Sequence, residues 1–304
     1  MTDEEFDELR PPAFAVAYRM LGSVSEAEDV VQEGFLRLHR AREGGERIES
    51  PRAYLSTVVS RLALDHLRSA RVRRETYVGA WLPEPLVTSA DEDPARMAER
   101  ADSLSLAFLV LLESLTPEQR AAYLLHDVFD EPYDRIAEIV GTSEQNARQL
   151  ATRARRHVQE RRPRFEASRE QQEQLATRFF AAAEEGDLEG LEELLADDVV
   201  LHGDGGGKAP ALKRAIHGRA KVARTLTAGF ARLPTLVDGY SSRREEVNGQ
   251  PGALFFDRED RLIAVMILDV AEGQIQGVSS IVNPDKLRHL GPVADLGALV
   301  RKRR

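Results

Sequence analysis

The sequence predicts a multidomain protein in which two all-α helical domains precede an α+β domain. Apolar residues recur at helical spacing from Phe6 to about Arg74 and again over residues 104–162. After about Ser168 the pattern changes to short strand-like runs separated by turn signals. A chain of 304 residues has the length of two or three domains of ordinary size.

The composition is that of an ordinary globular protein, with 42% hydrophobic and 31% charged residues. The longest apolar run, Leu104–Leu112, contains Ser105 and is too short to span a membrane, so we expect no membrane partner. The acidic N-terminus lacks the order of a signal peptide, and we therefore expect a cytoplasmic protein. Because cysteine is absent, disulfides, thiolate nucleophiles and Cys-ligated zinc are excluded, and we expect neither a cofactor nor a metal site.

The first helical domain, residues 1–75, is predicted to hold three helices. The first helix ends where Gly22 and Ser23 interrupt the apolar pattern. Ser50 is a good N-cap and Pro51 suits the first helical position, so a third helix begins there. The outer face of this third helix carries a cluster of arginines: Arg61, Arg68, Arg71, Arg73 and Arg74.

Residues 76–103 are predicted to form a linker, because they contain several prolines and end in acidic residues. The motif Trp81-Leu-Pro-Glu-Pro85 within this linker contains the only tryptophan of the chain. Because a tryptophan side chain is large and mostly apolar, we expect it to dock onto a folded domain.

The second helical domain, residues 104–164, contains a helix-turn-helix pattern. Thr116 begins a capping box and predicts a helix start. Gly141 ends a short amphipathic helix over residues 132–140, and Ser143 caps the next helix, which extends to Gln159.

The outer face of the helix at residues 143–159 carries side chains suited to DNA. The second helix of a helix-turn-helix lies in the major groove, where amides pair with adenine and arginine pairs with guanine or phosphate. The side chains of these types are Gln145, Asn146, Arg148, Gln149, Thr152, Arg153 and Arg156. The alternative is a solvated basic face on an ordinary helical hairpin, and the pattern alone leaves both open.

The total charge argues weakly against DNA binding, because 42 basic and 51 acidic residues give a net charge of −9. The arginines, however, cluster on two helices, and acidic residues concentrate in the linker between them. We therefore expect a protein that binds DNA weakly alone and competently as part of a complex.

The order of these motifs resembles bacterial sigma factors of the extracytoplasmic-function (ECF) type over about residues 6–160. The run Ser25–Leu38 is similar to the part of sigma-70 region 2 that binds the clamp helices of core RNA polymerase. Pro51–Arg68 is similar to the helix that reads the −10 promoter element, and Leu115–Arg120 with the helix-turn-helix is similar to region 4, which reads the −35 element. The resemblance implies core RNA polymerase, through its clamp helices and flap, and promoter DNA as partners.

The resemblance also implies the residues that make these contacts. The −35 element would meet the helix-turn-helix residues named above. The −10 element would meet Ser60, Arg61, Asp65, Arg68, Arg71, Arg73 and Arg74. Core polymerase would meet Glu28, Asp29, Gln32, Glu33 and Phe35.

The third domain, residues 168–290, is predicted to pack helices on one curved antiparallel sheet, followed by a tail at residues 291–304. The predicted helices are residues 174–185 and 187–195. The strand-like runs are residues 199–202, 236–247, 253–256, 262–269 and 274–282, with hairpin turn signals at Asn248-Gly249 and Glu272-Gly273.

Three motifs resemble the ECF subgroup with a fused C-terminal SnoaL-like domain (group 41, the SigJ type): Trp81–Pro85, Asp204-Gly-Gly-Gly-Lys208 and Asn283-Pro-Asp-Lys-Leu287. The resemblance implies a cone-shaped NTF2-like fold that controls the sigma domains in cis. The interdomain contacts would be made by Trp81, Leu82, Pro83, Glu84, Pro85, Asp204, Lys208, Asn283, Pro284, Asp285, Lys286 and Leu287. We expect charge-removing changes at Asp285 or Lys286 to alter transcription and to leave the fold intact.

The glycine run before Lys208 does not form a phosphate-binding loop, because Ala209 follows where that motif needs Ser or Thr. Two other functions stay open. One is a one-component transcriptional regulator with a ligand-sensing domain. The other is an isomerase or cyclase, whose candidate acid–base groups are His202, Asp204, Asp257 and Asp269. We expect a protein that is not an enzyme and whose third domain binds an unknown small ligand.

Overall fold

The structure, a computed structural model, describes residues 3–75, 77–88, 103–160 and 168–298. The chain divides into two compact units. Unit 1 comprises Met1–Thr76 and Leu109–Arg162, and unit 2 comprises Tyr77–Phe108 and Pro163–Arg304. The helices of both predicted helical domains therefore fall mainly into unit 1, whereas the described part of the predicted linker belongs to unit 2.

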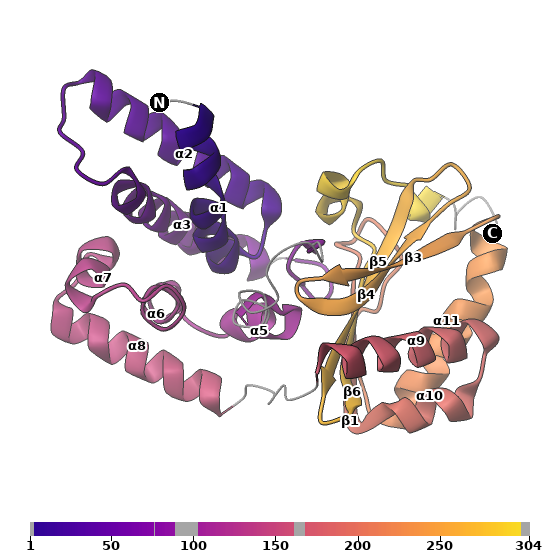
Figure 1. Ribbon diagram of the computed structural model, residues 1–304. Helices are drawn as coiled ribbons and strands as arrows, with labels where there is room; N and C mark the ends of the chain where they lie inside the picture. Colours follow the sequence, from indigo (N-terminus) through magenta and orange to yellow (C-terminus); the bar gives the residue numbers. More distant parts are fainter. Residues whose placement is uncertain (1–2, 76, 89–102, 161–167, 299–304) are drawn as a thin grey trace. The chain divides into compact units, whose positions relative to one another are not determined.

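Unit 1 begins with a bundle of three helices, drawn in indigo and purple in Figure 1: α1 (Asp3–Leu21), α2 (Val24–Glu43) and α3 (Pro51–Glu75). The Ser50 hydroxyl accepts a hydrogen bond from the Ala53 backbone N–H at 3.2 Å, which confirms the predicted start of α3. The bundle is closely packed at Gly34, where a Cβ atom would lie 2.9 Å from Val59 Cγ2.

The helix-turn-helix follows α5 (Leu106–Leu112), α6 (Pro117–Tyr123) and the π-helical turn η1 (Leu124–Val128), and it consists of α7 (Tyr133–Val140) and α8 (Glu144–Gln159). Thr116 forms the predicted capping box with Gln119. Gly141 has a φ of +77° and ends α7 in the left-handed conformation, and the Ser143 hydroxyl caps α8. The predicted helix-turn-helix boundaries are confirmed.

Unit 2 packs three helices on one face of a sheet (Figure 1): α9 (Arg169–Glu185), α10 (Leu188–Leu194) and α11 (Arg219–Leu236). In the described residues the sheet has six strands in the order β2-β1-β6-β5-β4-β3. Their bounds are β1 (Leu195–Asp204), β2 (Ile216–His217), β3 (Ser241–Val247), β4 (Gln250–Phe256), β5 (Leu262–Ala271) and β6 (Gln274–Ile281). The core between helices and sheet includes Phe180, Phe230 and Phe255, and the predicted α+β class is confirmed.

The sheet is not wholly antiparallel as predicted, because β1 pairs with β6 in parallel, with Gly203 opposite Ser280. The start of the predicted tail, residues 291–304, is also part of the fold. The Ala294 backbone N–H donates to the Leu262 carbonyl oxygen at 2.9 Å, and Leu296 is only 9% exposed, so this stretch belongs to the core.

Helix α11 was not predicted at all. It buries Val222, Leu226 and Phe230 at a spacing of four residues, which is a helical pattern. Gly229 and Pro234 weaken this signal because both residues disfavour helix interiors. Among the described helices, none is long and apolar enough to cross a lipid bilayer.

Candidate functional site

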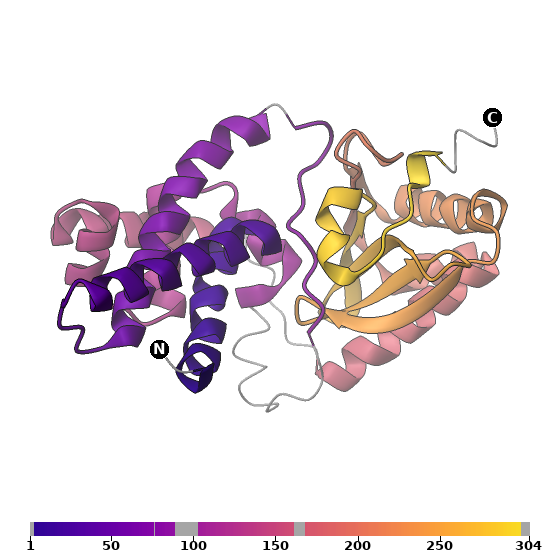
Figure 2. The same cartoon turned by 90° about the horizontal axis from the view of Figure 1, so that it is seen from above.

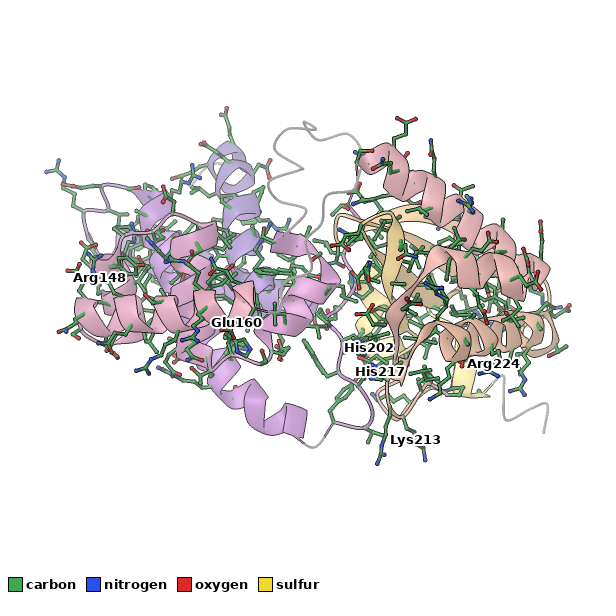
Figure 3. The ribbon with its side chains drawn as sticks, turned by 90° about the horizontal axis from the view of Figure 1, so that it is seen from below. Arg148, Glu160, His202, Lys213, His217 and Arg224 are labelled. Carbon is green, nitrogen blue, oxygen red and sulfur yellow. The ribbon has the colours of Figure 1, made fainter. Side chains whose placement is uncertain are left out.

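The residues predicted to read the −35 element lie on one face of α8, which also bears Ala147, Ala151 and Ala154 on its buried side. Figure 3 shows Arg148 near the start of this helix and Glu160 just past its end. The exposed residues are Gln145, Asn146, Arg148, Gln149, Thr152, Arg153 and Arg156. The structure therefore brings the whole predicted set together on a surface that a DNA groove can accept.

Local contacts hold some of these α8 side chains. Arg148 Nη2 donates to Glu144 Oε1 at 2.6 Å, and Arg156 Nε donates to Glu160 Oε1 at 2.9 Å. Exposed pairs one helical turn apart contribute only about 0.3–0.5 kcal/mol, so DNA phosphates can replace them. Arg153 has no ion pair within the described part of the chain and is already available.

Two of the arginines predicted to read the −10 element are paired with acids of the second helical domain. Arg61 Nη2 lies 2.8 Å from Glu138 Oε1, and Arg68 Nε lies 3.0 Å from Glu118 Oε1. Arg68 also donates to Asp65 at 3.2 Å. In this conformation of unit 1, the second helical domain covers part of the predicted −10 surface.

The structure does not place Ser60 where the predicted contact with the −10 element requires it. It is 0% exposed, and its hydroxyl has no hydrogen-bond partner within the described residues. Its neighbour Val59 is also fully buried, so Ser60 lies on the core side of α3 and is not presented to DNA. The side chains of the remaining members, Arg71, Arg73 and Arg74, lie outside the described residues.

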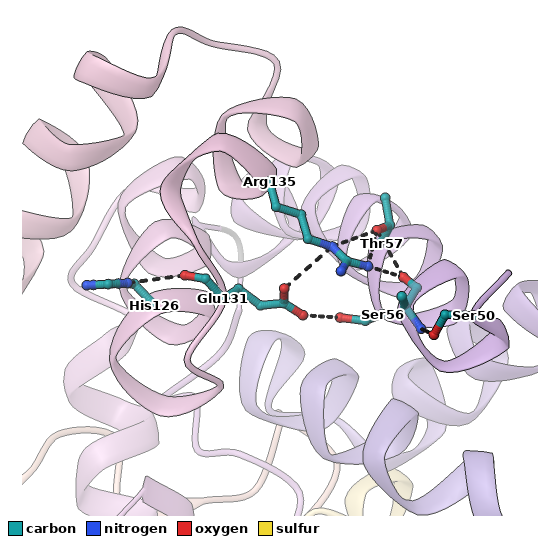
Figure 4. Close-up of polar contacts among 7 residues, drawn as sticks. Ser50, Ser56, Thr57, His126, Glu131 and Arg135 are labelled. Carbon is teal, nitrogen blue, oxygen red and sulfur yellow. Dashed lines mark hydrogen bonds and ion pairs between the residues drawn. The ribbon is translucent and has the colours of Figure 1, made fainter.

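A polar network joins the N-terminal part of α3 to the start of α7 (Figure 4). Arg135 donates to Thr57 Oγ1 at 2.9 Å and to the carbonyl oxygen of Ala53. The Ser56 hydroxyl donates to Glu131 Oε1 at 2.8 Å, and Glu131 is itself 3.4 Å from Arg135. Both helical domains are therefore held together by polar contacts along one side of α3.

The residues predicted to bind core polymerase lie on α2. Asp29 and Gln32 are exposed, and Glu28 and Glu33 are partly exposed. Arg10 makes two hydrogen bonds to Glu28, at 2.6 and 2.7 Å. A hydrogen bond from the Arg37 guanidinium lowers the pKa of Glu33 and keeps its carboxylate ionised. These side chains form an acidic surface along the helix.

Phe35, which was predicted to bind core polymerase, is not at the surface. It is only 5% exposed, and its ring centroid lies 4.6 Å from that of Phe6. Its neighbour Leu36 is 43% exposed, which is unusual for a large apolar side chain. Leu36 follows Asp29 by seven residues and Gln32 by four, so the three share a helical face. Sequence reasoning missed Leu36, although this spacing could have identified it.

The first part of the predicted linker, Tyr77–Thr88, runs alongside the sheet domain in unit 2 (Figure 2). Five residues hold its Tyr77–Leu86 part through their side chains, and we call them the linker-binding site: Asp204, Asn248, Asn283, Lys286 and His289. Three of them belong to motifs that the sequence predicted to be interdomain contacts.

Asp204 is the centre of the linker-binding site, and its side chain is 0% exposed. Its Oδ1 atom accepts hydrogen bonds from the Tyr77 hydroxyl at 2.5 Å and from the Gly206 N–H at 3.1 Å. Its Oδ2 atom accepts from the Leu82 N–H at 2.9 Å and from Lys286 Nζ at 2.7 Å. Burial and the hydrogen bond to Asp204 raise the pKa of Tyr77 well above its usual value, so Tyr77 stays a donor.

Lys286 contacts the linker on three sides. Its Nζ atom donates to the carbonyl oxygen of Leu82. The same atom lies 4.2 Å from the ring centroid of Trp81 and 4.9 Å from that of Tyr77. Cation–π contacts of this kind strengthen as water is removed, and Lys286 is 6% exposed. The docking predicted for Trp81 is therefore observed, against Lys286.

The glycines that follow Asp204 let the linker approach closely. Gly206 and Gly207 have φ values of +56° and +72°, which side chains rarely adopt. A Cβ atom on Gly206 would lie 2.3 Å from Asn283 Nδ2 and 2.9 Å from the Tyr77 hydroxyl. Larger residues here would displace the linker.

Asn248 contacts the predicted linker at Leu86 and the start of the second helical domain at Leu104, a role that sequence reasoning missed because the residue was read only as part of a turn. The Asn248 N–H donates to the Leu86 carbonyl at 2.7 Å, and Asn248 Oδ1 accepts from the Leu86 N–H at 2.9 Å. Its Nδ2 atom donates to the Leu104 carbonyl at 3.0 Å. Val87 extends the contact by pairing with Val247 as in an antiparallel sheet.

The other predicted interdomain residues have varied surroundings. Lys208 and Asp285 pair with each other at the surface. Leu82, Pro83, Glu84, Pro85 and Leu287 are buried, and Pro284 is partly exposed. His289 Nε2 lies 2.7 Å from the Pro85 carbonyl oxygen, which adds a linker contact that was not predicted.

The four candidate acid–base groups do not converge on a substrate site. Asp204 is occupied by the linker, and Asp257 pairs with Arg261 at 2.8 Å. Burial and the nearby His217 (Figure 3) lower the pKa of His202. Burial raises the pKa of Asp269 to about 7. None of the four lines the cavity between the sheet and α11, so the arrangement does not support acid–base catalysis there.

Three known protein families match successive parts of the chain. Sigma-70 region 2 matches residues 6–73, and Sigma-70, region 4 matches residues 105–158. A SnoaL-like domain matches residues 176–237.

Two curated proteins of Mycobacterium tuberculosis are similar over nearly the whole chain. ECF RNA polymerase sigma factor SigJ is 40% identical over 297 residues, which cover 94% of this chain and 93% of that protein. Probable ECF RNA polymerase sigma factor SigI is 35% identical over 285 residues, with 93% and 92% covered. The crystal structure of M. tuberculosis SigJ matches with a TM-score of 0.75 and 39% identity, over 94% of this chain and 98% of that one.

Proposed function

Because this chain belongs to the extracytoplasmic-function RNA polymerase sigma factors, we propose that it binds core RNA polymerase and directs initiation at promoters with −35 and −10 elements. Its SnoaL-like domain controls this activity in cis, through the linker between the two sigma domains. The protein acts in the cytoplasm, where polymerase and promoters are found.

The promoter-reading part of the proposal rests on α8 and α3. The amide and arginine side chains of α8 lie on one exposed face, and the first turns of such a helix contact base edges. Arg61 and Arg68 reach the −10 element once their partners Glu138 and Glu118 release them. Each exposed ion pair contributes about 0–1 kcal/mol, so polymerase binding can break them readily.

The polymerase-binding part rests on α2, where acidic side chains lie on the N-terminal side of the exposed Leu36. An apolar residue within a charged surface is typical of a protein interface, where the apolar group supplies affinity and the charges supply orientation. The charged group consists of Glu28, Asp29 and Glu33, together with the polar Gln32.

Control in cis rests on one observation: Asp204 and Lys286 of the SnoaL-like domain hold Leu82 of the linker through both its N–H and its carbonyl oxygen. Promoter reading requires the two sigma domains to take positions set by the DNA, and the linker limits those positions. A linker bound at Leu82 and again at Leu86 has fewer free residues to span that separation than a released one.

The proposal is tested by run-off transcription with purified core polymerase, the full-length chain and a randomised promoter library. Transcripts that start downstream of a common pair of elements are the expected result. Gel shifts of the selected promoter should require core polymerase for tight binding. Tight operator binding without polymerase, together with no transcript, would show a one-component regulator instead.

The control in cis is tested with a matched pair of variants. Lys286→Met removes a buried contact to the linker, whereas Lys208→Met removes the same charge from the surface. We expect Lys286→Met to change the amount of transcript and Lys208→Met to leave it near the wild-type level. Equal transcript from all three proteins would contradict control through the linker.

A further inference from the structure

Unit 2 contains a cavity of about 650 Å³ between the sheet and α11. Its inner wall is made of buried apolar side chains: Leu201, Leu226, Phe230, Phe255, Ile263 and Met266. The outer wall is formed by Pro210, Ala211 and Leu212 and by the exposed side of α11. A cavity of this size and lining suits an apolar organic molecule.

The charged residues of the cavity are all positive. Arg224 (labelled in Figure 3) and Arg232 line it from α11, two helical turns apart, and both are exposed at its rim. No Asp, Glu or His is among its lining residues. Neither arginine has an ion-pair partner within the described residues. Two unpaired guanidinium groups beside an apolar cavity favour a ligand with a carboxylate.

We propose that this cavity binds an anionic amphiphile, meaning an apolar chain or ring that carries one carboxylate, and that its binding changes how the linker is held. The apolar part lies against the inner wall, and the carboxylate lies at the rim beside Arg224 and Arg232. The regulatory half of this inference rests on the proposed control in cis.

The loop after β1 connects the cavity to the linker-binding site. On one side of this loop, Gly206 lies against Tyr77 and Asn283. On its other side, Leu212 lines the cavity, and a Cβ atom on Gly203 would lie 3.0 Å from the Leu212 nitrogen. Interiors packed this closely transmit displacements, so movement of Leu212 reaches the residues that hold Tyr77.

The strands provide a second connection. Gly203 of β1 and Val282, just after β6, line the cavity, and the next residues along the chain are Asp204 and Asn283. The N–H groups of Val282 and Asn283 donate to the Asp204 carbonyl oxygen at 2.8 and 3.0 Å. A ligand that moves these strand ends therefore alters the position of the Asp204 carboxylate, which holds the linker.

The binding half is tested by calorimetry on the full-length chain with three probes that share one apolar chain: decanoate, decanol and decylamine. We expect decanoate to bind once per chain and at least about tenfold tighter than the other two, since one charge-assisted contact is worth about that factor. Equal affinity for decanol would overturn the anionic class, and no binding of decanoate would overturn the site.

Two variants locate the binding. Gly229 lines the cavity, and a Cβ atom there meets no atom within 4 Å, so the side chain of Gly229→Leu starts in open space and should occupy the cavity. This variant should lose decanoate binding. It should keep its melting temperature, because leucine has a higher helix propensity than glycine. Arg224→Gln with Arg232→Gln should bind decanoate no better than decanol. Unchanged decanoate binding in Gly229→Leu would place the ligand elsewhere and overturn the proposal.

The coupling half is read from Trp81, the only tryptophan of the chain, which contacts Lys286 in the linker-binding site. Decanoate should shift the emission of Trp81 in the wild-type chain and leave it unchanged in Gly229→Leu. Binding by calorimetry without any change in emission would overturn the coupling. None of these readouts uses polymerase, so failure of the proposed sigma function, measured by transcription, stays distinguishable from failure of this inference.

Discussion

Lys286 Nζ lies 2.7 Å from Asp204 Oδ2, and the two side chains are only 7% and 0% exposed. A buried ion pair is stable only when its other hydrogen-bonding positions are filled, and here the linker fills them. Leu82 donates its N–H to Asp204 and accepts from Lys286 with its carbonyl oxygen. The linker is therefore part of the polar interior of the SnoaL-like domain.

Lys286→Met should release the linker and destabilise unit 2. Removing one member of a buried pair leaves the Asp204 charge uncompensated, which typically costs about 3–5 kcal/mol. Urea unfolding followed by Trp81 emission measures the loss locally. Lys208→Met is the control, because its pair with Asp285 is exposed and worth about 0–1 kcal/mol. Equal effects of the two variants would contradict the role of the buried pair.

Sequence reasoning identified most of the linker-binding site but not its energetics. The motifs containing Asp204 and Lys286 were recognised by resemblance, which cannot distinguish a buried lysine from an exposed one. The expectation that changes at Lys286 or Asp285 leave the fold intact now applies only to Asp285. Asn248 was missed because its side-chain partners, Leu86 and Leu104, are 162 and 144 residues distant in sequence.

Glu118→Gln combined with Glu138→Gln should expose the −10 surface of α3. The substitutions remove the partners of Arg68 and Arg61, and two exposed pairs together contribute about 0–2 kcal/mol. We expect affinity for promoter DNA to rise by about two- to tenfold. The rise should be largest at low salt, because at high salt screening already weakens the two ion pairs of the wild-type chain. Fluorescence anisotropy with a labelled promoter duplex measures this.

Glu173→Gln provides the control for that experiment, since Glu173 lies on α9 of unit 2 and pairs with Arg169 of the same helix. It raises the net charge of the chain by one without freeing Arg61 or Arg68. An equal rise in DNA affinity in the control would mean that net charge, and not masking of α3, limits binding.

Local signals predicted the ends of the helices well. The errors at Ser60 and Phe35 concern which side of a helix faces the core. Caps at Ser50 and Ser143 and the left-handed Gly141 are short-range features with few alternatives. Whether Phe35 or Leu36 faces the core depends on where α1 lies, since Phe35 packs on Phe6 of that helix. An apolar pair of neighbours is therefore ambiguous until the packing is known.

Leu36→Ser should weaken binding to core polymerase by about three- to tenfold, because fully burying a leucine is worth about 1.5–3 kcal/mol and 43% of Leu36 is still exposed in the free chain. The stability of the free chain should hardly change, since Leu36 is 43% exposed. Surface plasmon resonance with immobilised core polymerase measures the affinity. Val78→Ser is the control, because Val78 is 62% exposed and lies on the linker. Normal binding by Leu36→Ser would remove Leu36 from the interface.

Asp269 makes the stability of unit 2 depend on pH. Its carboxyl is buried, Oδ1 has no hydrogen-bond partner within the described residues, and burial raises its pKa from 3.8 to about 7. Between these values the folded chain holds a proton that the unfolded chain releases, so this group's contribution falls as pH rises to about 7 and is constant above it.

Asp269→Asn should therefore stabilise unit 2 by about 1–3 kcal/mol at about pH 8, with the gain fading as the pH falls towards 4. Asp257→Asn should behave in the opposite way. Burial raises the pKa of Asp257, but hydrogen bonds from Arg261 and Glu259 outweigh it and lower the pKa overall. Asp257→Asn therefore destabilises throughout pH 4–8, and its effect fades only below the unfolded pKa of 3.8. Thermal unfolding of both variants and the wild type over this range should give a pH-dependent difference for Asp269→Asn and a constant one for Asp257→Asn. Parallel curves for Asp269→Asn and wild type would show that Asp269 does not titrate there.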